Sequence, residues 1–483
     1  MDKTVKLSSD INQNIRLVHQ FLPVKRSFDV IGRELIIGQA TRAYLVFIDG
    51  FAKDDIMLWI LQVLQSLSEN DMSNITIQTL MTKKIGYIEV ERFNDLEQLR
   101  SMVLAGAVGL IVDGQDEGLI IDAREYPVRS PEEPELEKVS RGSRDGLVET
   151  IIFNTALIRR RLRDPNLIFE IKTVGKRSKT DVSIAYLDDM VDKKLLSEIQ
   201  DKIDKIDVGA LVMAEKTLEE LLIKKHWYNP LPQVKFTERP DVVAAHLMEG
   251  HIAIIVDTSP SIMLLPVTLF HFTQHAEDYY QNILVGSYYR WIRFFGMLSA
   301  LLLPPLWLLL VQNKELLPDF LQFLGPNDEY TLPLFVQLLL LEFGMDVLRL
   351  SSIHTPSALN TSLGIIGGLI LSDLAVKVGI FVPETVLYIA LAAVGTFATP
   401  SLEFALAIRI FRLFLLVMTG VFGLWGFSLS LLVILIIVLT SRSFKNGKRY
   451  TWPLIPFKWK PLAHILFRMP IPKIGSNENG KNK

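Results

Sequence analysis

The distribution of hydrophobic and polar positions changes near residue 290. Before it, short apolar runs alternate with charged stretches, whereas long apolar stretches follow one another from 291 to 440. The first of these, residues 291–311, contains Arg293 as its single charged residue. About 20 apolar residues are enough for a helix to cross the hydrocarbon core of a bilayer. The pattern therefore predicts a soluble N-terminal α/β region of two lobes, followed by an all-α polytopic membrane domain.

The first predicted α/β lobe covers residues 30–126 and follows an N-terminal segment, residues 1–29. Its clearest strand is the apolar run 43–49, and an amphipathic helix follows that strand. Two further apolar runs, 108–113 and 118–123, flank a turn rich in Asp and Gly. Such a pair of runs predicts a β-hairpin.

A second α/β lobe is predicted over residues 147–270. The segment before it, residues 127–146, is rich in Pro, Glu and Arg, and this composition indicates an exposed linker. The lobe is expected to begin with a helix over residues 147–163 and to end with a strand over residues 251–257. Residues 271–290 are assigned to a juxtamembrane segment, because their tyrosines suit the interface between a membrane and water.

Four apolar segments are the expected membrane spans. They lie within the predicted membrane domain, residues 291–440, and occupy residues 291–311, about 360–382, about 384–400 and 403–440. The last segment is interrupted by Arg409 and Arg412 and is long enough for one long span or for two, so about four to five transmembrane helices are predicted. With four crossings, residues 332–341 would lie at the interface as an amphipathic or re-entrant element.

The distribution of charge predicts the orientation of these spans. The tail, residues 441–483, is rich in Lys and Arg and has Glu478 as its single acidic residue, whereas residues 312–358 carry an acidic excess. Because loops rich in Lys and Arg stay on the cytoplasmic side, the tail is expected in the cytoplasm. The start of the chain lacks the apolar segment of a signal peptide, so the two lobes are also expected in the cytoplasm.

Composition excludes several classes of function. The chain has no cysteine, which excludes disulfides, thiolate metal sites and cysteine nucleophiles. Its net charge is −2, and its basic residues cluster beside the predicted membrane domain, so we do not expect nucleic-acid binding. It contains no phosphate-binding loop of the Gly-x-x-x-x-Gly-Lys-Ser/Thr type. We therefore expect no cofactor and no enzymatic activity.

Two charged residues lie inside the second predicted span. Asp373 and Lys377 are four residues apart, and Ser372 precedes the aspartate. Charges in a membrane helix are costly and usually face a partner or a water-filled cavity, so these three residues are candidates for an ion pathway. The alternative is an ion pair within one helix, in which the two charges only neutralise each other.

Six further charged residues lie within or beside the predicted membrane domain. They are Glu342, Asp346, Arg349, Glu403, Arg409 and Arg412. Arg409 and Arg412 share one face of a helix because they are three residues apart. They could line a pore mouth, meet Glu403 or Glu342, or bind lipid phosphates. The other interpretation is that they anchor the helix at the membrane boundary, where arginine side chains reach the interface.

Three weaker motifs suggest other functions. Asp257-Thr-Ser resembles half of an aspartic-protease motif, but a single copy at a strand end is more typical of a turn. His271 and His275 have the spacing of two zinc ligands on a helix, although the glutamate of His-Glu-x-x-His is absent. The arginine run 159–161 indicates a solvated face, or a salt-bridge surface between lobes or subunits.

Several collinear motifs resemble the A subunits of GerA-type spore germination receptors. They are Arg141-Gly-Ser-Arg-Asp-Gly-Leu-Val-Glu-Thr, Asn154-Thr-Ala-Leu-Ile-Arg-Arg-Arg-Leu-Arg-Asp-Pro165, Glu249-Gly-His-Ile-Ala-Ile-Ile-Val-Asp-Thr-Ser-Pro260 and Glu277-Asp-Tyr-Tyr280. Two departures from the family pattern, Met345-Asp-Val-Leu-Arg-Leu-Ser-Ser and Ser443-Phe-Lys-Asn-Gly-Lys-Arg-Tyr450, favour a divergent branch over nutrient receptors. The short N-terminus is most like the branch of stage V sporulation protein AF.

This resemblance implies a function that the residues alone do not. It implies a polytopic protein of the spore inner membrane that self-associates into a ring with a central ion pathway. We therefore predict an ion-channel subunit that promotes spore germination through ion release, with membrane lipid and a partner membrane protein of the spore as its neighbours. The alternative is a non-conducting scaffold, or a receptor A subunit that relays a nutrient signal to partner membrane proteins.

Overall fold

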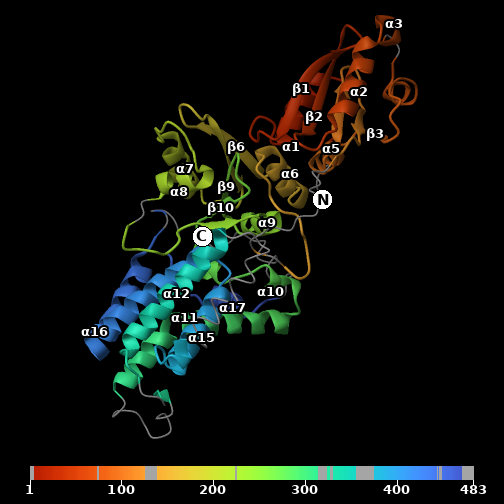
Figure 1. The fold of residues 1–483 in the computed structure, drawn as a ribbon. Helices are drawn as coiled ribbons and strands as arrows, with labels where there is room; N and C mark the ends of the chain where they lie inside the picture. Colours follow the sequence, from red (N-terminus) through yellow and green to blue (C-terminus); the bar gives the residue numbers. More distant parts are fainter. Residues whose placement is uncertain are drawn as a thin grey trace. The chain divides into compact units, whose positions relative to one another are not determined.

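The computed structural model of the chain is shown in Figure 1. It describes residues 5–72, 75–125, 137, 139–223, 226–313, 324–326, 330–354, 375–442, 444 and 449–469. The chain divides into two compact units. The N-terminal unit consists of Met1–Lys224 with Phe236–Pro266, and the helical unit consists of Lys225–Lys235 with Val267–Lys483. The predicted linker, residues 127–146, lies largely outside the described residues.

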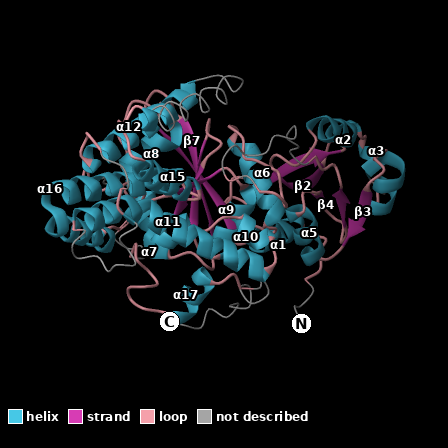
Figure 2. Ribbon diagram, turned by 60° about the horizontal axis from the view of Figure 1, so that its bottom comes forward, coloured by secondary structure: helices cyan, strands magenta, loops and turns pink. Residues whose placement is uncertain are grey.

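The N-terminal unit contains two five-stranded sheets of matching strand order (Figure 2). The first sheet has the order β1-β2-β4-β5-β3, and the second has the order β6-β7-β9-β10-β8. The strands of the first are β1 (Val30–Ile37), β2 (Thr41–Ile48), β3 (Val90–Phe93), β4 (Val108–Val112) and β5 (Gly118–Ile121). The strands of the second are β6 (Leu167–Val174), β7 (Thr180–Leu187), β8 (Lys235–Thr237), β9 (Ile252–Val256) and β10 (Ile262–Leu265).

Helices cover these sheets and bury their apolar residues. In the first lobe they are α1 (Ile11–Phe21), α2 (Asp54–Ser66), α3 (Glu69–Met72), α4 (Ile77–Thr79), the π-helix η1 (Leu80–Lys84) and α5 (Leu96–Leu104). α1 and α5 pack on one face of the sheet and α2 packs on the other, each around its own apolar core. In the second lobe they are α6 (Ile151–Arg161), α7 (Lys193–Asp204), α8 (Ala214–Leu222) and α9 (Pro240–Met248). The expected two-lobed α/β region is thus present.

Matching polar contacts show that the two lobes repeat one design. In the first lobe the Asn14 side chain accepts a hydrogen bond from the Ser8 N–H at 2.9 Å and donates one to the Ser8 carbonyl. In the second lobe Asn154 makes the same pair of bonds with Val148, and the bond that it accepts is 2.8 Å long. Both asparagines are fully buried at the fourth residue of a helix.

Asp257 takes part in the same repeat. Its carboxylate follows β9 and accepts a hydrogen bond of 3.1 Å from the N–H of Ile151, the first residue of α6. Asp113 follows β4 and accepts a bond of 3.2 Å from the N–H of Ile11, the first residue of α1. Because an acceptor at the start of a helix satisfies an unpaired N–H, Asp257 acts as a helix cap in the structure. This role favours the turn interpretation of Asp257-Thr-Ser over the protease one.

A buried ion pair joins the two lobes. Arg159 of α6 binds both carboxylate oxygens of Asp29, at 2.8 and 3.0 Å, and neither side chain reaches solvent. The Phe28 N–H donates to the Phe169 carbonyl at 3.0 Å, and the Phe169 N–H donates to Ser27 Oγ at 2.8 Å. The guanidinium also lies 5.1 Å from the centre of the Phe169 ring. The first member of the arginine run is therefore an interlobe contact.

The helical unit consists of antiparallel apolar helices. Its elements are η2 (Leu269–Phe272), α10 (Glu277–Tyr280), α11 (Ile283–Gln312), α12 (Leu334–His354), α14 (Ala375–Lys377), α15 (Pro383–Phe397), α16 (Leu402–Thr440) and α17 (Trp459–Leu466). By length and composition, α11 and α16 could each cross a membrane, and α15 is a shorter apolar helix. The span expected at about 360–382 lies largely outside the described residues. The segment expected at the interface, 332–341, belongs largely to the longer helix α12, which packs against α15 and α16.

α15 runs antiparallel to α11 and in close contact with it. A Cβ on Gly395 would lie 2.2 Å from the Gly296 carbonyl oxygen, so the two backbones meet there. Farther along, the rings of Trp307 and Tyr388 stack with their centres 4.8 Å apart. We call the end of the helical unit near Phe272 the proximal end, and the end near Trp307 the distal end.

α16 reverses direction at Gly423 and is a helical hairpin. The glycine has φ 57° and ψ −135°, values that are not helical. A Cβ on Gly426 would lie 1.9 Å from the Met418 carbonyl oxygen. Residues eight apart in a continuous helix are separated by about 12 Å along the axis. The chain therefore folds back on itself between these two positions.

The ends of α16 confirm this reversal. The Phe272 ring stacks on Phe404 at 5.8 Å and lies 6.2 Å from the ring of Tyr450. A straight helix of 39 residues would be about 58 Å long, whereas the ten residues from Thr440 to Tyr450 span at most about 36 Å. Both ends of α16 thus lie at the proximal end, and the long apolar stretch forms two antiparallel arms.

The hairpin predicts a short distance between the two ends of α16. Spin labels on Glu403→Cys and Thr440→Cys, placed in the full chain, should give a distance below about 30 Å by double electron–electron resonance. A continuous helix would separate these positions by about 56 Å. The chain has no native cysteine that would take up label. The pair Leu402→Cys and Val421→Cys lies within one arm and should give about 28 Å in either case.

Arg159→Ala should destabilise the N-terminal unit by about 3–5 kcal/mol, because it leaves the buried Asp29 carboxylate without its cation. Urea unfolding of the full chain, followed by hydrogen exchange in β6 and α6, measures this loss. Arg160→Ala, at an exposed position of the same helix, should change stability by less than about 1 kcal/mol. Equal effects of the two substitutions would contradict the assigned role of Arg159.

Candidate functional site in the helical unit

Charged side chains of α12 and α16 meet in the middle of the helical unit. α12 runs antiparallel to the first arm of α16, residues 402–422. A Cβ on Gly420 would contact the Phe335 ring near the distal end. About two turns farther toward the proximal end, Glu342 contacts Arg412. The antiparallel register therefore places acidic residues of α12 opposite basic residues of α16.

Glu342 and Arg412 form a close, buried ion pair. Arg412 Nε lies 2.6 Å from Glu342 Oε1, and Arg412 Nη2 donates to Glu342 Oε2 at 3.0 Å. The two residues are 1% and 2% exposed. Arg412 Nη1 also donates to the Ala300 carbonyl at 2.7 Å and to Thr396 Oγ1 at 3.3 Å. One guanidinium therefore connects α16 with α12, α11 and α15.

Arg409 extends this network by one turn. Its Nη1 lies 2.7 Å from Asp346 Oδ1, and its Nη2 donates to the Glu342 carbonyl at 2.9 Å. A cavity of about 30 Å³ lies beside the network, lined in part by Arg349, Arg409, Arg412 and Thr396. This volume has room for about one water molecule. The network therefore contains two arginines and two carboxylates beside a small cavity that Arg349 also lines.

The structure brings together most of the second set of predicted charges. Of the partners considered for Arg409 and Arg412, Glu342 is the one that they meet. Glu403 is exposed at the start of α16, where it accepts a hydrogen bond of 2.9 Å from Ser401 Oγ.

The first predicted set is described only in part. Lys377 is exposed as the last residue of α14. Ser372 and Asp373 lie outside the described residues, so an ion pair between Asp373 and Lys377 stays a prediction.

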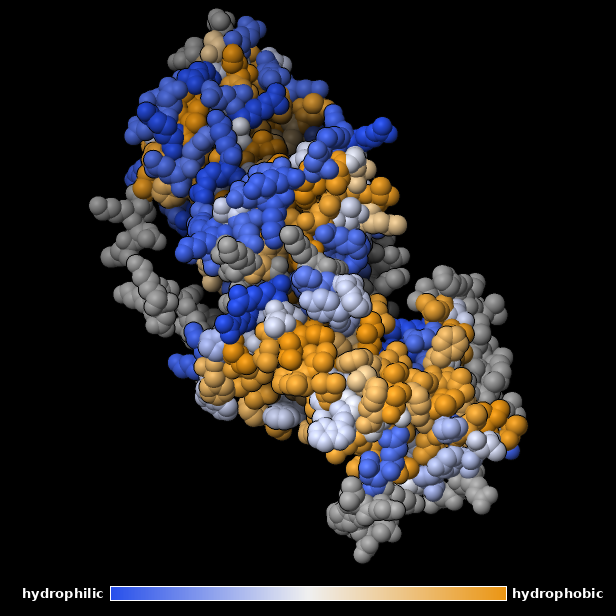
Figure 3. Space-filling model, turned by 90° about the vertical axis from the view of Figure 1, so that its left-hand side faces the viewer, coloured by the Kyte–Doolittle hydropathy of each residue, from blue (hydrophilic) through white to orange (hydrophobic). Residues whose placement is uncertain are grey.

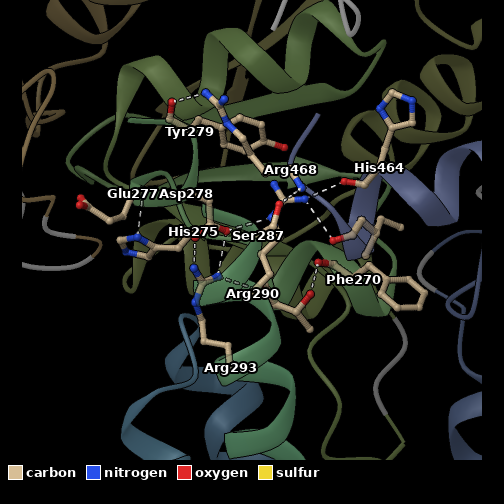
Figure 4. Close-up of polar contacts among 12 residues, drawn as sticks. Phe270, His275, Glu277, Asp278, Tyr279, Ser287, Arg290, Arg293, His464 and Arg468 are labelled. Atoms are coloured by element: carbon tan, nitrogen blue, oxygen red, sulfur yellow. Dashed lines mark hydrogen bonds and ion pairs between the residues drawn. The ribbon is translucent and has the colours of Figure 1, made fainter. Parts of the chain in front are cut away.

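A second charged cluster lies at the proximal end (Figure 4). The Asp278 carboxylate is fully buried and contacts two arginines of α11. Arg290 Nε lies 3.2 Å from Asp278 Oδ2, and Arg293 Nη1 lies 3.0 Å from the same oxygen. The sequence offered a signal in the motif Glu277-Asp-Tyr-Tyr280, but a charge pattern alone does not identify such distant partners.

The same cluster holds the C-terminal helix α17 in place. Arg290 Nη1 donates to the carbonyls of His464 at 2.6 Å and Ile465 at 3.1 Å. Arg468 donates from its backbone N–H to Ser287 Oγ at 3.1 Å and from Nη2 to the Tyr279 carbonyl at 2.8 Å. These contacts join α10, the start of α11 and the C-terminal segment.

His271 and His275 serve local structure in this region. His271 Nδ1 accepts a hydrogen bond of 2.9 Å from the Thr268 N–H at the start of η2. His275 Nδ1 accepts a bond of 3.1 Å from the Glu277 N–H. Each imidazole thus uses one ring nitrogen to cap the backbone, which favours the structural interpretation of this pair over a zinc site.

The chain matches the family described as Bacillus/Clostridium GerA spore germination protein over residues 19–479. This match covers most of the sequence, so the chain belongs to that family, as its motifs predicted.

Two relatives and one solved structure are similar to the chain. Stage V sporulation protein AF of Bacillus subtilis (strain 168) is 42% identical over 92% of this chain and 90% of that protein. Spore germination protein GerLA of Bacillus cereus is 32% identical over 92% of this chain and 90% of that protein. The crystal structure of the N-terminal domain of the A subunit of the Bacillus megaterium spore germinant receptor GerK3 is 25% identical. The match covers 55% of this chain and 97% of the GerK3 chain, with a TM-score of 0.41.

Glu342→Gln should destabilise the helical unit by about 3–5 kcal/mol, because Arg412 would stay buried without a counter-charge. Thermal unfolding of the full chain in detergent measures the effect. Asp346→Asn should cost at most about 1 kcal/mol, because the Asp346 side chain is 39% exposed. The double variant Glu342→Met, Arg412→Met should recover much of the loss, since it removes both charges together. If it were less stable than Glu342→Gln, the pair would not be the interaction that the single substitution breaks.

Proposed function

We propose that the chain is a subunit of an oligomeric ion channel in the spore inner membrane that promotes spore germination through ion release. The observation that carries this proposal is the buried network of Glu342, Arg409 and Arg412 between apolar helices. Charges in such surroundings are costly and are usually kept for function. Membership of the GerA family supplies the link to spore germination.

The exposed surface of the helices supports their insertion in a membrane. The apolar window of α16 is 17% buried, and on the face seen in Figure 3 hydrophobic residues gather over the helical unit. Soluble monomers rarely expose so large an apolar surface. The two arms of α16, residues 402–422 and 424–440, would be about 31 and 25 Å long, close to the hydrocarbon thickness of about 30 Å. The cytoplasm then adjoins the proximal end, where the basic tail emerges and α11 begins.

We propose that Ser372, Asp373 and Lys377 line the ion pathway. In this arrangement the pair of Glu342 and Arg412 fixes the spacing of the helices beside the pathway. The chains assemble into a ring, and a partner membrane protein of the spore adjoins it.

A non-conducting scaffold or receptor A subunit is the second candidate. It is favoured by the direct contact between Glu342 and Arg412, which neutralise each other and leave no net charge at the centre of the network. In that case the two lobes and the tail would relay a signal in the cytoplasm, and partner proteins would conduct the ions.

Ion flux through proteoliposomes that contain the full chain distinguishes the two candidates. We expect flux, and we expect the double variant Asp373→Asn, Lys377→Gln to change its size or its cation selectivity, because the pathway would lose both charges. Glu403→Gln, at an exposed position, is the matched control and should leave flux unchanged.

The outcomes separate the parts of the proposal. Flux that is identical in the double variant would keep the channel and remove these residues from its pathway. No flux from a complex that also contains its native partners would favour the scaffold.

A further inference from the structure

The segment between Tyr450 and α17 is a loop whose two stems are fixed on η2. At the first stem, the buried Tyr450 accepts a hydrogen bond of 2.8 Å from the Leu269 N–H through its carbonyl. At the second stem, α17 packs its buried residues Leu462 and Ile465 against Phe270. The loop between the stems is therefore held at the proximal end of the helical unit.

The tip of this loop exposes large apolar side chains. Every residue from 454 to 460, the last two of which begin α17, is exposed, and the most prominent are Phe457, at 64%, and Trp459, at 60%. Leu454 and Ile455 are also exposed, at 43% and 40%. Water disfavours such a surface, so a stable loop of this composition needs something to cover it.

The shape of the tip is defined by its own hydrogen bonds. The Leu454 N–H donates to the Thr451 carbonyl at 2.8 Å, and the Lys458 N–H donates to the Pro453 carbonyl at 2.9 Å. The backbone of the tip therefore has a defined path, and the apolar side chains are exposed along it.

Two lysines alternate with the aromatic residues of the tip. Lys458 lies between Phe457 and Trp459, and Lys460 follows directly. Residues 449–469 contain no Asp or Glu. Apolar and aromatic residues that alternate with lysine are typical of segments that lie in the headgroup layer of an anionic membrane.

Aromatic residues of α11 lie beside the segment that follows α17. The Trp291 ring lies 6.1 Å from that of Phe467, which follows α17. Tyr288 and Phe295 are exposed on the same part of α11. Tryptophan and tyrosine gather at the level of lipid headgroups, so Trp291 and Tyr288 suit the same environment as the loop tip.

We propose that the loop tip, residues 454–460, inserts into the cytoplasmic headgroup layer and binds anionic phospholipid. Leu454, Ile455, Phe457 and Trp459 enter the boundary between headgroups and acyl chains, and Lys458 and Lys460 contact the lipid phosphates. Each lysine near an anionic surface favours binding by about fivefold. The inference rests on the proposed membrane insertion of the helical unit and does not require ion conduction.

A fluorescent label on Ile455→Cys in the full chain tests this proposal. In vesicles that contain phosphatidylglycerol, the label should shift to the blue, lose quenching by neutral acrylamide and gain quenching by headgroup-linked nitroxide lipid. The matched control is Val212→Cys, an 81% exposed apolar position in the N-terminal unit, which should stay accessible to acrylamide. Adding Lys458→Gln and Lys460→Gln should abolish the difference between phosphatidylglycerol and phosphatidylcholine vesicles.

Three results would overturn the proposal. The label at 455 could be as accessible as the label at 212 in anionic vesicles. It could be equally protected in vesicles of phosphatidylcholine alone, which would exclude anionic phospholipid as the specific ligand. The lipid difference could also survive the loss of both lysines. Ion flux from the same vesicles is read separately, so its absence together with a protected label would remove conduction and leave the lipid site in place.

Discussion

A carboxylate that has lost its water needs another partner, and in the helical unit Arg412 is the partner of Glu342. The same guanidinium donates to Ala300 on α11 and to Thr396 on α15, so four helices depend on one side chain. An apolar pair of similar size would often be at least as stable, because burying two charges is costly. The charges therefore contribute specificity of helix register, which apolar packing alone does not give. Arg412 can reach the Glu342 carboxylate and Arg409 the Glu342 carbonyl in one register only, which fixes α12 against the first arm of α16.

Arginine has the same function at three places in the chain. Arg159 binds Asp29 and also the carbonyls of Asp164 and Leu167. Arg290 contacts Asp278 and donates to two carbonyls that follow one another in α17. Five donors in a planar group allow one arginine to satisfy a carboxylate and nearby backbone oxygens together. In each case the contacts come from elements far apart in sequence, so the ion pair defines how those elements meet.

The sequence predicted the features that depend on residues close together in the chain. Long apolar stretches gave the helices, and spacing placed Arg409 and Arg412 on one face with Glu342 as a possible partner. The sequence left open whether 403–440 forms one span or two, and it did not predict the position of the reversal, because Gly423 stands among other glycines and its backbone angles depend on the contacts of both arms. The sequence did not show whether Arg159 or Arg160 is the buried arginine, because this depends on which face α6 turns toward the first lobe. Residues 108–113 and 252–257 have similar sequences, each an apolar run that ends in Asp. This internal similarity is the sequence signal that could have revealed the repeat of the lobes.

The size of the cavity beside Arg409 limits how the network could act in conduction. About 30 Å³ holds roughly one water molecule, and a cation needs several ligands or waters around it. Both Glu342 and Arg412 are also engaged with each other, so neither offers a free charge to a passing ion. An ion path would therefore lie outside this cavity, along surfaces that several chains bring together. In such an assembly the buried pair would control the path indirectly, through the distance between the helices that it holds.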